Sequence, residues 1–156
     1  MLRLLRRYPI WFIPSLAFTS GAEAADDTSV LCSWEFLVVM SAYDEACTLE
    51  QNLEMKRALA ESISQLDAFI IRHSDLPNTA PLLAKKKDEL RRRVFDDIDA
   101  NREGGLDKCR DDEELGIAKD YREFAESNPP SKLRTWVTDD LVRAESREYP
   151  LAGICF

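Results

Sequence analysis

The hydrophobic pattern is densest in residues 30–47, VLCSWEFLVVMSAYDEAC. Over its first fourteen positions, only Cys32, Ser33, Glu35 and Ser41 interrupt the apolar residues. A helix that is apolar nearly all round, and too short and too polar at its end to span a bilayer, is typical of a buried core helix. The pattern therefore predicts a central helix over about 29–47, against which the other helices pack.

Four later segments place apolar residues three and four positions apart, as a helix with one buried face requires. We expect helices over about 49–73, 81–101 and 111–127, and a fifth after Pro129 and Pro130. The predicted inward positions are Leu49, Leu53, Ala60, Ile63, Leu66 and Ile70; Leu83, Leu90, Val94 and Ile98; Leu115, Ala118, Tyr121, Phe124 and Ala125; and Leu133, Trp136, Val137, Leu141 and Ala144. No strand alternation or repeat is present. The predicted fold class is all-α, a compact bundle of four to five helices.

Local signals predict where these helices begin and end. Thr48 and Gln51 have the spacing of a capping box, so they should open the second helix. Asn78 or Thr79 is expected to cap the third helix just before Pro81, and Ser131 the fifth. Gly104 and Gly105 should end the third.

The first residues have the three parts of a secretory signal peptide. A basic start with Arg3, Arg6 and Arg7 precedes an apolar run over 9–18 and a small-residue site at 22–24. The alternative is an uncleaved membrane anchor, but ten apolar residues are about half a bilayer span. We predict a signal peptide over 1–24 and one domain over 25–156, in a periplasmic or secreted protein with no stable membrane anchor after cleavage.

Removal of 1–24 leaves 132 residues that hold 18 Lys and Arg against 28 Asp and Glu, a net charge of −10. Such a surface repels nucleic acid and anionic lipid and attracts cationic partners. The expected partner is therefore another, basic protein, and no nucleic acid.

All four cysteines follow the predicted cleavage site, which favours two disulfides in an exported chain. In a continuous helix Cys32 and Cys47 are about 22 Å apart, too far to be bridged. Antiparallel neighbours bring the ends of the first and third helices together, so we predict Cys47–Cys109. Cys32–Cys155 is then the second bridge, which ties the C-terminal tail to the central helix.

One interhelical segment, 99–110, resembles an EF-hand calcium loop. Asp99, Asn101 and Glu103 stand at alternate positions, Gly104 is at the sharp turn, and Asp107 is where a water-mediated ligand often lies. Arg110 departs from the family, because it occupies the twelfth position, where a bidentate Glu completes the calcium shell. The resemblance implies calcium as an alternative ligand, held by Asp99, Asn101, Glu103 and Asp107, and the other interpretation is an ordinary acidic loop.

Other chemistry has little support in the sequence. His73, the single histidine, follows a predicted helix end, where an imidazole caps carbonyls, and that role is favoured over a catalytic one. The basic run over 85–93 suggests either an anion site or a solvated face with intrahelical ion pairs to Asp88 and Glu89, and the second is favoured. No nucleophile, phosphate-loop or metalloprotease motif is present, so we predict no catalytic residues, no cofactor and no enzyme activity.

The sequence therefore predicts an exported, non-enzymatic helical domain that binds a protein through its acidic surface, as an inhibitor, immunity protein or adaptor. The alternative is a calcium-binding structural or sensor domain that uses the loop over 99–110.

Overall fold

The computed structural model describes residues 30–110 and 117–146. Five helices make up the regular structure of these residues, which contain no strand: α1 (Val30–Cys47), α2 (Leu53–His73), α3 (Thr79–Glu103), α4 (Ile117–Ser127) and α5 (Pro130–Glu145). The predicted all-α class is confirmed. The predicted signal peptide, the acidic stretch at 111–114 and the tail after 146 lie outside the described residues.

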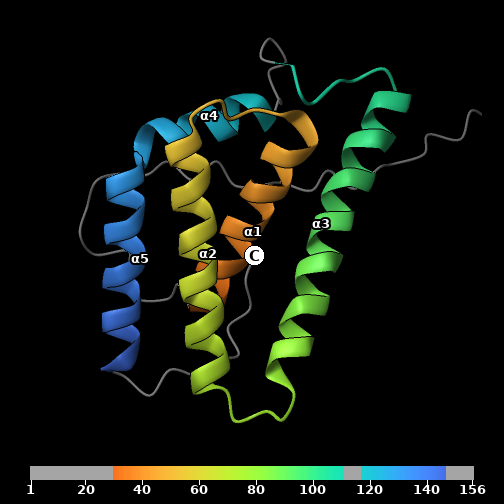
Figure 1. Cartoon of the computed structure of the whole chain (residues 1–156). Coiled ribbons are helices and arrows are strands. Elements are labelled where there is room, and N and C mark those ends of the chain that lie inside the picture. The colour runs from red at the N-terminus through yellow and green to blue at the C-terminus, as the bar shows by residue number, and fades with distance from the viewer. Residues whose placement is uncertain (1–29, 111–116, 147–156) are drawn as a thin grey trace, which may run out of the picture.

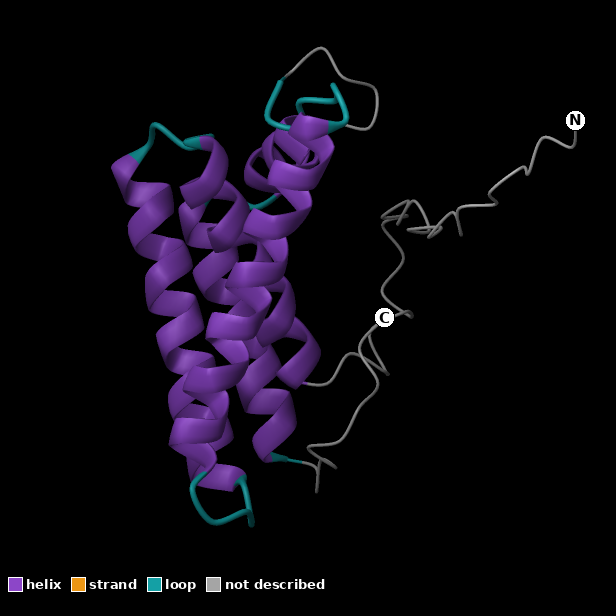
Figure 2. Ribbon diagram, turned by 90° about the vertical axis from the view of Figure 1, so that its right-hand side faces the viewer, coloured by secondary structure: helices purple, strands orange, loops and turns teal. Residues whose placement is uncertain are grey.

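Helix α1 is the shared core element, as its apolar pattern predicts. Trp34 and Leu37 are fully buried on it, and it contacts each of the other four helices. Figure 1 shows α1 inclined between α2 and α3, with α5 on the far side of α2. Figure 2 shows the long helices packed side by side along one common direction.

A polar contact is built into this core where α1, α2 and α3 meet. The indole Nε1 of Trp34 donates a hydrogen bond to Asp67 Oδ1 at 2.6 Å, and Lys87 Nζ lies 2.6 Å from Asp67 Oδ2. The lysine nitrogen is also 6.0 Å from the centroid of the Trp34 ring. Asp67 thus satisfies the one polar atom of a fully buried indole and is itself neutralised.

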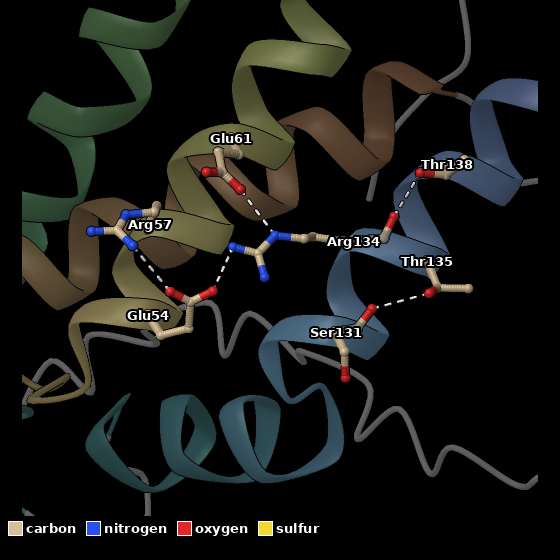
Figure 3. A network of polar contacts seen from close by, with 7 residues as sticks. All are labelled: Glu54, Arg57, Glu61, Ser131, Arg134, Thr135 and Thr138. Atoms are coloured by element: carbon tan, nitrogen blue, oxygen red, sulfur yellow. Dashed lines mark hydrogen bonds and ion pairs between the residues drawn. The ribbon is translucent and has the colours of Figure 1, made fainter.

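A second polar network joins α2 to α5 at the surface (Figure 3). Arg134 donates to Glu54 at 2.8 Å and to Glu61 at 2.9 Å, and Arg57 also pairs with Glu54. Within α5, the hydroxyls of Thr135 and Thr138 donate to backbone carbonyls one turn earlier. The guanidinium of Arg134 lowers the pKa of Glu54, with a smaller effect from Arg57.

The start of α2 differs from the prediction. Thr48 does not cap it: this residue has φ +52°, and the helix begins at Leu53 with Asn52 as its N-cap, whose side chain accepts from Glu54 N. The left-handed turn directs the chain away from α1, so 48–52 become a connection instead of a first helical turn. Two predicted core positions are therefore wrong: Leu53 is 76% exposed and Ala60 is exposed. The buried stripe consists of Met55, Ala58, Leu59, Ser62, Ile63, Leu66, Phe69 and Ile70.

The other predicted stripes agree with the structure better than the predicted caps do. Leu83, Leu90, Val94 and Ile98 are the buried residues of α3. Asn78 does occupy the N-cap of α3, but with φ +66° and no side-chain capping bond. The cap at Ser131 is wrong, because α5 begins one residue earlier at Pro130, which has no N–H and suits the first turn of a helix. Gly104 and Gly105 end α3 as predicted, with Gly105 at φ +85°.

One end of the bundle gathers several chain segments. Here α1 and α3 end, α2 and α5 begin, and α4 lies across them (Figure 1). The predicted bridge Cys47–Cys109 is present at this end, with a Cα–Cα distance of 5.3 Å. Beside it a small apolar cluster joins α1, α3 and α4 through Ala42, Val94, Ile98 and Ile117.

None of the helices in the described ranges has the length and hydrophobicity needed to cross a bilayer.

Candidate functional site

The net charge of the chain is concentrated in one segment. Residues 96–126 hold twelve Asp and Glu against five Lys and Arg, a net charge of −7, whereas the whole chain has −8. The described part of this segment comprises the last turns of α3, the connection with Cys109, and α4. These elements hold eight Asp and Glu against five Lys and Arg, a net charge of −3, and they meet at the end of the bundle that α4 covers. We call the described residues of this segment, 96–110 and 117–126, the acidic end.

Carboxylates on α1 and α2 are neutralised within the fold. Each one there takes part in an ion pair: Glu35 with Lys86, Asp44 with Lys56, Glu45 with Arg91, Glu54 and Glu61 with Arg134, and Asp67 with Lys87. The basic run of α3 supplies three of these cations. The predicted intrahelical ion pairs with Asp88 and Glu89 are therefore wrong, because α3 packs against α1 and α2, and Lys86, Lys87 and Arg91 reach carboxylates on those helices.

The carboxylates of α4 are different. Asp120, Glu123 and Glu126 make no ion pair with any residue of the described ranges. Partial burial, and then the negative charge of Glu123, raise the pKa of Asp120, while Lys119 lowers it. Burial is the larger cause of the raised pKa, and the effect of Glu123 shows that Asp120 lies near a second carboxylate of the same helix.

An open pocket of about 400 Å³ lies between α4 and the connection from α1 to α2. Its size is in the range of ligand-binding pockets. Its polar lining residues are Glu50, Asn52, Arg122 and Glu126, and its other lining residues are Leu49, Met55, Ala118, Tyr121, Ala125, Pro129 and Pro130. The pocket thus combines two carboxylates with apolar walls, beside the acidic end.

Tyr121, a lining residue of the pocket, has a buried phenol hydroxyl without a hydrogen-bond partner in the described ranges. Its side chain is 3% exposed. Burial, and then the charges of Asp44 and Glu50, raise the pKa of this phenol well above its ordinary value. An unsatisfied buried hydroxyl is uncommon in folded proteins, which sets this position apart from the satisfied indole of Trp34.

The residues of the EF-hand resemblance do not form a loop. Asp99, Asn101 and Glu103 lie within the last turns of α3, and Asp107 follows in the connection. Asn101 Nδ2 donates to the carbonyl oxygen of Asp97, and the Asp107 carboxylate accepts from the backbone N–H of Cys109. Over 30–110 and 117–146 there is no group of three or more His, Cys, Asp or Glu side chains placed to hold a metal ion.

The other predicted sites have separate positions. Cys32 lies half-buried in the first turn of α1, and its predicted partner Cys155 lies outside the described residues, so that bridge stays a prediction. His73 ends α2, as predicted, and stacks on Phe69 with ring centroids 4.2 Å apart.

No protein-family model, curated protein or solved structure matches the chain.

Sequence reasoning predicts an acidic surface but not its location or the pocket. The location depends on which cations form ion pairs within the fold, and Lys86, Lys87 and Arg91 of α3 pair with carboxylates of α1 and α2. The pocket depends on the left-handed residue Thr48, which moves Glu50 and Asn52 out of a helix and places them opposite α4. The unequal charge of 96–126 is the one signal in the sequence that could have located the site.

Proposed function

We propose that this protein is an exported, non-enzymatic helical domain that binds a basic protein through its acidic end. The observation that carries the proposal is the contrast between the helices. The carboxylates of α1 and α2 are all ion-paired, whereas Asp120, Glu123 and Glu126 of α4 make no ion pair in the described ranges. Negative charge that the fold does not use is available to a partner.

The physical role of such a surface is to steer and orient a partner of opposite charge. Complementary potentials raise the association rate at low salt and suppress wrong partners. An inhibitor, immunity protein or adaptor that meets a basic target benefits from this effect. The Cys47–Cys109 bridge supports export, since structural disulfides persist mainly in oxidising compartments.

Site-directed photo-cross-linking in the native host tests the partner directly. A photo-reactive amino acid at position 123 places the probe on the exposed face of α4, and position 64, exposed on α2, serves as the control. We expect position 123 to form an adduct with a protein of basic isoelectric point, and position 64 to form none. Adducts with an acidic protein, or equal adducts from both positions, contradict the proposal.

Charge variants test whether the acidic end is the part that binds. The triple variant Asp120→Asn, Glu123→Gln, Glu126→Gln removes three negative charges from α4. The matched control, Asp75→Asn, Asp88→Asn, Glu89→Gln, removes three from elsewhere, and these carboxylates also lack ion pairs with described residues. We expect the α4 triple to lower the affinity for the cross-linked protein by roughly tenfold or more at low salt. Equal losses in both triples would show that net charge alone, without a defined site, drives the binding.

A further inference from the structure

The pocket beside α4 has two carboxylates that come from different elements. Glu50 belongs to the connection between α1 and α2, and Glu126 to the last turn of α4. Glu50 Oε1 accepts one hydrogen bond, from the backbone N–H of Asn52 at 2.7 Å. Glu126 makes no hydrogen bond or ion pair with any described residue. Both groups therefore retain acceptor capacity.

The remaining lining defines what else an occupant contacts. Met55 and Ala118 are 2% and 4% exposed, so they form an apolar floor on the core side of the pocket. The ring of Tyr121 belongs to the same lining, and Pro129 and Pro130 add two rigid apolar residues at the start of α5. Arg122 is the single cation of the lining and is already engaged in an interaction of its own.

A group that binds in the pocket has to interact favourably with both the two carboxylates and the apolar lining. A small anion would face two carboxylates, and a purely apolar group would remove them from water without a partner, which is unfavourable. A basic side chain has an alkyl stem that packs on apolar surface and a charged head that donates to carboxylates.

We propose that this pocket is the anchor point for the partner and receives one arginine or lysine side chain from it. The carboxylates of Glu50 and Glu126 accept from the charged head, and the stem packs against Met55 and Ala118. This inference rests on the proposed function, because it specifies how the acidic end recognises a basic protein.

Methyl NMR of the oxidised full chain, with N-acetyl-arginine amide and N-acetyl-lysine amide as probes, tests the pocket without the partner. Met55 lines the pocket, whereas Met40 packs against the core elsewhere and serves as an internal reference. We expect a saturable shift of the Met55 methyl signal and none of Met40. The neutral isostere N-acetyl-citrulline amide should give no saturable shift. Equal shifts with citrulline, or an unmoved Met55 with both cations, overturn the proposal.

Substitutions separate the pocket from the general charge of the acidic end. Glu126→Gln and Glu103→Gln each remove one charge there, but only Glu126 lines the pocket. We expect Glu126→Gln to lower the affinity for the cross-linked protein roughly tenfold and Glu103→Gln to change it much less. Ala125→Leu fills the pocket without a charge change and should weaken binding as well, with melting curves to verify that it folds.

The two proposals fail in different ways. Equal effects of Glu126→Gln and Glu103→Gln, together with a neutral Ala125→Leu, would overturn the anchor and leave the acidic end as a diffuse binding surface. The proposed function would be overturned if position 123 formed no adduct with a basic protein and if neither charge triple changed the affinity. In that case the methyl signal of Met55 still reports on whether the pocket takes a cation.

Discussion

At the scale of single residues, two buried polar side chains are treated in opposite ways. The indole of Trp34 has a short hydrogen bond to Asp67, while the phenol of Tyr121 has no partner in the described ranges. A satisfied buried donor stabilises the fold modestly, but a buried group that loses its partner bears the full desolvation penalty. We therefore expect the stability of the fold to respond in opposite ways when a polar group is removed at each of these two sites.

Substitution Asp67→Ala removes the acceptor of a fully buried indole N–H and leaves Lys87 without its carboxylate. We expect the free energy of unfolding to fall by about 2–3 kcal/mol, as measured by urea unfolding of the oxidised protein. Asp88→Ala, at an exposed carboxylate of α3 without an ion pair in the described ranges, is the matched control and should change it by less than about 0.5 kcal/mol. Similar losses in the two variants would show that the Trp34 contact contributes little.

Substitution Tyr121→Phe removes the hydroxyl and keeps the ring. Because that hydroxyl has no partner, we expect the free energy of unfolding to stay constant or rise by up to about 1 kcal/mol. A loss of stability in the urea titration would show instead that the hydroxyl is satisfied in solution.

The same substitution changes how stability depends on pH. The pKa of Tyr121 is raised above its ordinary value of 10.0, so the unfolded chain releases the phenol proton at a pH where the folded chain keeps it. The associated stability is complete below about pH 10 and is lost as the pH rises through the folded-state pKa. Urea midpoints above pH 10 should therefore fall less steeply for Tyr121→Phe than for the native chain. Tyr43, whose pKa is also raised by burial, remains in both proteins.

At the scale of helices, the sequence predicts buried stripes well and helix connections poorly. The four inward positions of α3 and the central role of α1 follow from apolar spacing, because burial of apolar surface dominates packing. The start of α2 does not follow from it, since Thr48 adopts a left-handed conformation that a capping-box pattern does not reveal. The sequence also does not predict the ion-pair partners of the charged side chains on α3, because these partners depend on which helices pack against α3.

The bridge Cys47–Cys109 links the end of α1 to the connection after α3, across a separation of 62 residues. In the chain-entropy model, a loop of this length stabilises the fold by about 4 kcal/mol. The double variant Cys47→Ala, Cys109→Ala should lower the free energy of unfolding by an amount of this order, as measured by urea unfolding. A change of less than about 1 kcal/mol would mean that packing in the small cluster around Val94 and Ile98 holds this end without the covalent link.

At the scale of the whole molecule, charge is distributed unequally along the bundle. Among the described residues, six Lys and Arg side chains on α2, α3 and α5 form ion pairs between helices, and the surplus of carboxylates in the sequence falls on 96–126. The composition predicts an acidic protein. The surplus on 96–126 is visible in the sequence, but the sequence does not show that the described part of this segment lies at the end covered by α4, or that a pocket lies beside it.

Export of the protein after removal of the signal peptide is a prediction about the whole chain. If the signal peptide is removed after Ala24, the protein purified from its native host begins at Ala25 and lacks Arg3, Arg6 and Arg7. N-terminal sequencing with intact-mass measurement checks this, and oxidised cysteines should be found in the same sample. An intact Met1 with free thiols would contradict the expected compartment.

The position of the Cys47–Cys109 bridge has a consequence for when the protein becomes competent to bind. It joins the end of α1 to Cys109, within the segment 96–126 that carries most of the net negative charge, so we expect reduction of the sulfur atoms to loosen this contact first. We expect a newly made, still reduced chain to present its carboxylates in no fixed arrangement. Under the proposed export, oxidation would then complete the binding surface only in the compartment where the proposed basic partner is met, and the reduced precursor would not bind basic proteins inside the cell that makes it.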